Sequence, residues 1–167
     1  MPEETIYVAD TSALIEIQKK YPHDVFKTIW DNLSKLADKE RIIAPKQVLE
    51  EINLFALEDY LKKWAVGHKK IFKEQTSFQL SKVREILLLY PKMAEYKKGH
   101  EQADPYVVAL ALDKDPQTKL VQNNKRSVVT EEKSVRGKPE KIPDVCSKFG
   151  VEFFDILGFF RQEGWRF

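Results

Sequence analysis

The sequence predicts an α/β fold in which helices cover both faces of a parallel sheet. Short apolar, β-branched runs alternate with longer amphipathic stretches, and acidic or hydroxyl residues directly follow several of the short runs. Residues 5–9 form the first run and are apolar enough to be buried on both faces. Asp10, Thr11 and Ser12 come next, with side chains that favour helix starts. Such strand–helix units join parallel strands through right-handed crossovers.

The later elements continue this alternation, and we expect one domain over residues 1–167 with a helical insertion at about 57–98 that contains no strand. The stretch Val107–Leu112 is apolar on nearly all sides, which predicts burial against the sheet. Residues 133–141 are polar and are expected to form a mobile loop. The helices expected after the first unit cover 25–40, 46–73 with breaks near 57–58 and at Gly67, 76–98 with a break at Pro91, 104–113, 142–149 and 155–167. The expected strands cover 41–44 (closed by Pro45), 119–122, 127–129 and 151–154.

Composition excludes several classes of protein. A formal net charge of +2 gives a field too weak to indicate a nucleic-acid partner by itself. The single cysteine, Cys146, excludes an internal disulfide framework and a thiolate zinc site, and it fits a reducing compartment, so we expect a cytoplasmic protein. No apolar run approaches the length of about 18 residues that a membrane span needs, so we expect no membrane association.

Four acidic residues lie far apart in the sequence, each where a strand or loop is expected to turn into a helix: Asp10, Glu51, Asp104 and Glu132. Each has a local alternative, because Asp10 and Asp104 suit helix capping while Glu51 and Glu132 suit solvated positions. In open parallel sheets, ligands bind outside the carboxyl ends of the strands. Carboxylates gathered there need cations, and all-oxygen ligation favours Mg²⁺ or Mn²⁺ over Zn²⁺. The predicted chemistry is hydrolysis of a phosphodiester bond.

Four motifs, in this order and spacing, resemble those of the PIN-domain nucleases: Ile6–Ser12, Val48–Ile52, Ala103–Ala111 and Val128–Glu132. The chain is most similar to a branch of small prokaryotic PIN-like proteins of unassigned function. The resemblance implies a Rossmann-like three-layer α/β/α sandwich with a central, mostly parallel sheet. It also implies Mg²⁺- or Mn²⁺-dependent cleavage of RNA, often by the toxin of a toxin–antitoxin pair. An antitoxin protein and a second copy of the chain are the partners it implies.

The resemblance also assigns roles to residues. Asp10, Glu51 and Asp104 would be the core metal-binding acids, and Glu132 the fourth, with the neighbouring Glu131 as the alternative. Thr11 or Ser12 would position a water molecule or phosphate, and Thr130 would fix the fourth acid.

A basic group borders Glu132 in the sequence and is predicted to contact substrate: Lys125, Arg126, Lys133 and Arg136. Two other functions use the same residues. One is a DNA-directed, structure-specific nuclease, and the other is an inactive PIN-like module that binds RNA or a protein and uses the acids as helix caps.

Overall fold

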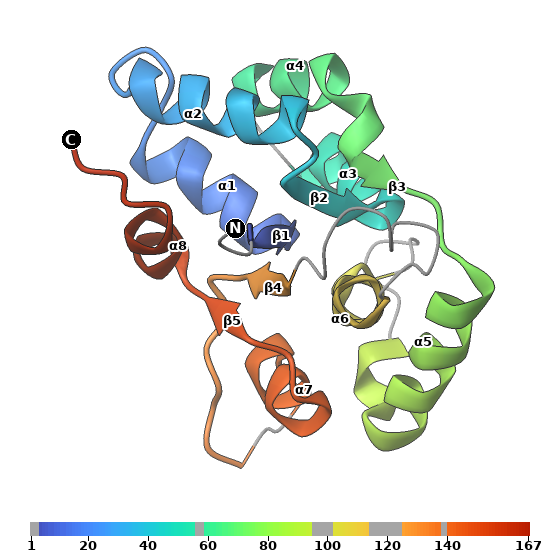
Figure 1. The fold of residues 1–167 in the computed structure, drawn as a ribbon. Helices are drawn as coiled ribbons and strands as arrows, with labels where there is room; N and C mark the ends of the chain where they lie inside the picture. The colour runs from blue at the N-terminus through green and yellow to red at the C-terminus, as the bar shows by residue number, and fades with distance from the viewer. Residues whose placement is uncertain (1–3, 56–58, 95–101, 114–124, 138–139) are drawn as a thin grey trace.

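The computed structural model of the protein describes residues 4–55, 59–94, 102–113, 125–137 and 140–167 (Figure 1). Five strands in these residues form one sheet in the order β3-β2-β1-β4-β5, and every pairing between neighbours is parallel. The strands are β1 (Ile6–Ala9), β2 (Ile42–Pro45), β3 (Phe72–Lys73), β4 (Arg126–Val129) and β5 (Phe153–Phe154). The central position of β1 explains its composition, since Tyr7, Val8 and Ala9 are all buried.

The register between β1 and β4 fixes the geometry of the sheet's carboxyl edge. Ala9 pairs with Val129, so the next residue of each strand, Asp10 or Thr130, leaves the sheet at the same level. From β1 the chain crosses to β2 and β3 on one side, whereas β4 and β5 lie on the other side. The direction of the crossovers therefore reverses between β1 and β4, which is where open α/β sheets bind ligands.

Helices lie on both sides of the sheet. In Figure 1, α1, α2 and α4 lie on one side, α6 and α7 lie on the other, and α5 packs on the outer side of α6. The helices are α1 (Thr11–Lys20), α2 (Lys27–Asp38), α3 (Lys46–Phe55), α4 (Asp59–Gly67), α5 (Ser77–Leu89), α6 (Asp104–Leu112), α7 (Ile142–Phe149) and α8 (Ile156–Gln162), with 3₁₀ turns at Lys69–Ile71 and Pro91–Ala94. The fold is the predicted three-layer α/β/α sandwich.

The core follows the expected apolar pattern. Every residue of α6 from Pro105 to Ala111 is buried, which confirms the prediction from its uninterrupted apolar run. On the side of α1 and α8, the ring of Tyr7 contacts that of Phe159 edge to face with centroids 4.5 Å apart. Within the described residues, no helix is both long enough and apolar enough to span a bilayer.

Three sequence predictions need correction. The region 57–98 contributes β3 to the sheet, so it is not the strand-free insertion that we expected; a two-residue strand is too short to leave a periodic signal. Pro45 is the last residue of β2 and pairs with Lys73, so the strand includes the residue that we expected to lie just after it. The C-terminal helix ends at Gln162, earlier than predicted. The predicted strand at 119–122 lies outside the described residues.

Candidate functional site

The candidate site lies at the carboxyl edge of β1 and β4, and Asp10 is its centre. The Asp10 side chain is only 2% exposed, and its Oδ2 accepts hydrogen bonds from Ser12 Oγ at 2.6 Å and Thr130 Oγ1 at 2.9 Å. Asp10 occupies the N-cap position of α1, yet its side chain makes no capping hydrogen bond. The capping alternative is therefore wrong for this side chain, which is directed toward β4.

The surroundings of Asp10 disfavour its charged form. Burial, the largest cause, and the negative charges of Glu132 and Glu51 together raise the pKa of its carboxyl group to about 7, against the two hydroxyl hydrogen bonds that lower it. Both hydroxyl groups donate to Oδ2, and among the described residues none donates to Oδ1. One carboxylate oxygen is thus anchored while the other retains its capacity to accept.

Glu51 joins α3 to α1 and α6. Its side chain is 8% exposed, so the expectation of a solvated border residue is wrong. Thr11 Oγ1 donates to Glu51 Oε2 at 3.3 Å, and the Ala103 amide donates to Oε1 at 3.2 Å. Asp104 directly follows Ala103 and is the first residue of α6, with Ala103 at the N-cap position where we had expected Asp104. The Asp104 side chain is half-buried.

The structure separates the two adjacent glutamates. Glu131 Oε1 accepts a hydrogen bond from the Ile156 amide at the start of α8, at 2.7 Å. Glu132 Oε2 accepts one from the Ile142 amide at the start of α7, at 2.9 Å, and the Glu132 amide donates to Thr130 Oγ1. The charge of Glu132, not that of Glu131, is among the causes that raise the Asp10 pKa. Of the pair, Glu132 is the acid that interacts with Asp10.

Hydrogen bonds therefore connect all four segments that the sequence motifs occupy. Thr130 and Ser12 bond to Asp10, and Thr11 and the Ala103 amide bond to Glu51. Burial and the charges of Asp10 and Glu132 raise the pKa of the Cys146 thiol to about 12, so this buried cysteine is close to both acids. As these side chains lie, no three Asp, Glu, His or Cys residues of the described chain are grouped closely enough to hold a metal ion.

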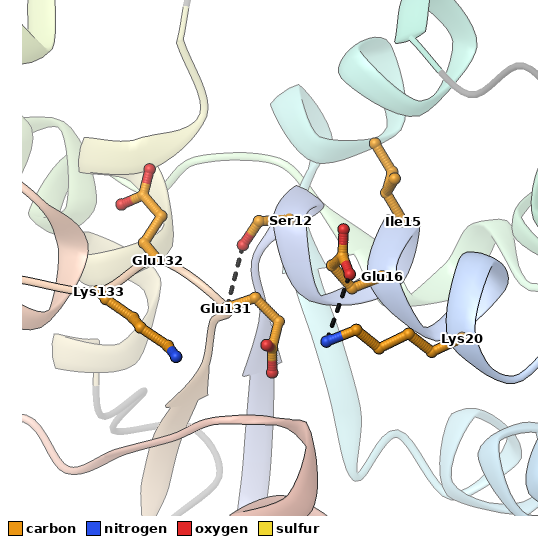
Figure 2. Close-up of a pocket in the computed structure, with 7 residues that line it drawn as sticks. All are labelled: Ser12, Ile15, Glu16, Lys20, Glu131, Glu132 and Lys133. Carbon is orange, nitrogen blue, oxygen red and sulfur yellow. Dashed lines mark hydrogen bonds and ion pairs between the residues drawn. The ribbon is translucent and has the colours of Figure 1, made fainter.

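Two of the predicted substrate contacts lie elsewhere. Arg126 begins β4 and its Nη1 donates to the Leu110 carbonyl, while Lys125 precedes the strand and forms an ion pair with Glu152. Both are at the amino end of β4, opposite Thr130, so the expectation that they border the acids is wrong. Lys133 and Arg136 are exposed and follow the carboxyl end of the strand. Lys133 lines a hollow together with Ser12 and Glu132 (Figure 2).

Gln47 is a feature of this edge that the sequence interpretation missed. It lies one helical turn before Glu51 on α3 and is 1% exposed, yet neither Oε1 nor Nε2 has a hydrogen-bond partner. An i, i+4 relation to a candidate acid was the available signal, but a glutamine near a helix start is ordinarily solvated.

Replacing Gln47 by leucine is expected to raise the free energy of unfolding by about 1–3 kcal/mol, because the change removes two buried polar atoms that lack partners. Urea denaturation measures the difference. Gln79→Leu is the matched control: Gln79 is 5% exposed, but its Nε2 donates to Asp113 Oδ2 at 2.8 Å, so its loss should destabilise. Equal destabilisation by both substitutions would show that the Gln47 amide is hydrogen-bonded in solution.

Comparison with known proteins gives one match. No curated protein and no solved structure shows a significant match to the chain. A family model described as a domain of unknown function, DUF4411, matches residues 7–167 and so includes all four candidate acids. That description does not mention PIN domains, so the resemblance to them stays a prediction. The match covers nearly the whole length of the chain, so the chain belongs to the DUF4411 family.

Proposed function

We propose that the protein is a metal-dependent nuclease that hydrolyses phosphodiester bonds in RNA. The main support is the set of hydrogen bonds through which Asp10 and Glu51 bind Thr130 and Ala103, since these bonds bring acids distant in sequence to one edge of the sheet. The ligand site of an open parallel sheet is expected at this edge, between β1 and β4.

The chemical type of the donor atoms suits a hard divalent cation. They are carboxylate oxygens, and their mutual repulsion, which raises the pKa of Asp10, would be relieved by a positive ion. Asp10, Glu51, Asp104 and Glu132 would hold Mg²⁺ or Mn²⁺, and the hydrogen bonds to Glu51 and Glu132 would yield to it. Such an ion makes a water molecule more acidic and screens the charge of the phosphate.

The chain's own residues have defined tasks in this proposal. Ser12 and Thr130 hold Asp10 Oδ2, so that the carboxylate is oriented before a ligand arrives. Thr11 does the same for Glu51 Oε2. Lys133 and Arg136 follow the carboxyl end of β4 and would attract the nucleic-acid backbone.

A second function is favoured by a specific observation. The carboxylates of Glu51 and Glu132 accept hydrogen bonds from the backbone amides of Ala103 and Ile142, as acids that only stabilise helix starts would do. Under this reading the protein is an inactive module that binds RNA or a protein. The roles of toxin and antitoxin rest on the resemblance alone and stay predictions.

Calorimetric titration with Mn²⁺ separates the two functions. The nuclease predicts a site whose affinity falls by about 10-fold or more in Glu132→Gln and remains unchanged in Glu131→Gln, because only Glu132 interacts with Asp10. The native protein should also cleave RNA in Mn²⁺ and lose this activity in chelator. Absence of an acid-dependent metal site, or cleavage that persists in chelator, would reject the proposal. Single-stranded DNA in a parallel reaction tests the DNA-directed alternative.

A further inference from the structure

A hollow of about 520 Å³ opens beside Ser12, between α1 and the segment that follows β4 (Figure 2). Glu132, one of the candidate acids, lines it together with Ser12, whose Oγ is 2.6 Å from Asp10 Oδ2. Its volume lies in the range of about 300–1,000 Å³ that is typical of ligand sites. A ligand in the hollow would therefore border the candidate site and could contact Glu132.

Two ammonium groups approach the hollow from opposite sides. Figure 2 shows Lys20 reaching in from α1 and Lys133 from the segment after β4, with the Glu131 carboxylate between them. Lys133 forms no ion pair within the described residues, although two glutamates precede it. The Glu131 and Glu132 carboxylates each accept a backbone hydrogen bond. The positive charge of Lys133 is therefore available to an anion.

Lys20 can also leave its present ion-pair partner easily. Its ion pair with Glu16 spans 3.6 Å, and the Lys20 side chain is 57% exposed. Exposed ion pairs at this helical spacing contribute little to stability. Lys20 can thus exchange a carboxylate for a phosphate at small cost.

The arrangement of charges selects the kind of ligand. A compact polyanion that contacted both lysines would meet the Glu131 carboxylate that lies between them. A nucleic-acid strand avoids this repulsion, because its phosphates are separated by neutral nucleosides whose hydroxyl and amino groups donate hydrogen bonds. Ile15 adds an apolar wall for such a nucleoside.

We propose that this hollow binds the segment of single-stranded nucleic acid next to the bond that is cleaved. Lys20 and Lys133 each contact a backbone phosphate, and the nucleoside between them lies against Ile15 and Glu131. The proposal rests on the nuclease function, because it makes the hollow the continuation of that site.

Salt-dependent binding tests the proposal without catalysis. Fluorescence anisotropy would follow a short labelled oligouridylate binding to the full chain in EDTA over a series of KCl concentrations. The logarithm of the association constant falls as the logarithm of the salt concentration rises. Lys20→Gln and Lys133→Gln should each make this slope shallower by about 0.7, and the double variant should make it shallower by about 1.4. Lys19→Gln is the matched control, because Lys19 is equally a last-turn lysine of α1 near Glu16 but does not line the hollow.

The outcomes separate this proposal from the nuclease function. Unchanged slopes in Lys20→Gln and Lys133→Gln, or an equal decrease in Lys19→Gln, would overturn the binding site even if the protein cleaves RNA. Lysine-dependent slopes with no cleavage in Mn²⁺ would retain the binding site and reject the nuclease. An oligothymidylate in a second series should show the same lysine dependence, because both contacts are to phosphate.

Discussion

Asp10→Asn is expected to increase the free energy of unfolding at pH 8 while it abolishes cleavage. The substitution removes a buried charge whose carboxyl pKa is raised to about 7 by burial and by neighbouring acids, from an ordinary value of 3.8. A shift of this size corresponds to an upper bound of about 4 kcal/mol. The loss of activity should be about 10²-fold or more, because in the proposed nuclease this group would hold charge at the reacting centre.

The direction of the expected stability change follows from the way the free energy of unfolding depends on pH. Below about pH 4 the Asp10 carboxyl group carries a proton in both the folded and the unfolded chain. Between about pH 4 and 7 the unfolded chain has lost that proton while the folded chain keeps it, so the stability of the native protein falls as pH rises. Above pH 7 both states are ionised and the full penalty applies. Asp10→Asn should lack this decline.

Urea unfolding in EDTA at pH 4.5, 6 and 8 measures the effect. Asp31→Asn serves as the control, because Asp31 is exposed and its pKa is lowered by the hydrogen bond from Lys27, so its removal should bring no gain at pH 8. A decrease in stability of Asp10→Asn at pH 8, or an unchanged pH profile, would show that the Asp10 carboxylate is not strained by its surroundings.

Glu163→Ala is expected to lower the free energy of unfolding by about 3–5 kcal/mol. Glu163 and Arg41 are largely buried, with side chains 12% and 16% exposed, and Arg41 binds both carboxylate oxygens at 2.9 Å. Tyr7 Oη donates to the same carboxylate at 2.7 Å. Removing Glu163 leaves the guanidinium without its main partner in a poorly solvated place, and that cost exceeds the worth of the pair itself.

Thermal and urea unfolding measure this loss, and Glu4→Ala is the control. Glu4 also faces Arg41, at 3.7 Å, but its side chain is 61% exposed, so its removal should change stability by less than about 1 kcal/mol. The double variant Arg41→Met/Glu163→Leu should recover much of the loss, because it removes both charges together. Comparable effects of Glu4→Ala and Glu163→Ala would contradict the assigned role of burial.

The sequence predicted the parts of the site that depend on local pattern. Apolar strands followed by capping residues located Asp10 and Thr130, and the α6 motif located Asp104. Lys125 and Arg126 were misplaced because closeness in sequence was taken for closeness in space. A four-residue strand spans about 13 Å, so residues at its two ends lie on opposite edges of the sheet.

Other features had no local signal. Whether Glu131 or Glu132 faces Asp10 depends on the amides of Ile156 and Ile142, which the fold brings from later in the chain. The unsatisfied amide of Gln47 likewise arises from burial by distant segments. Such long-range contacts leave no trace in periodicity or composition.

The passage from β1 into α1 consists of Asp10 alone, because the strand ends at Ala9 and the helix begins at Thr11. No further residue separates the strand from the helix, so this junction cannot absorb a change in length. One inserted residue would rotate Ser12 away from Asp10, and one deleted residue would draw the carboxylate back into the sheet. We therefore expect natural insertions and deletions in this family to fall elsewhere in the chain.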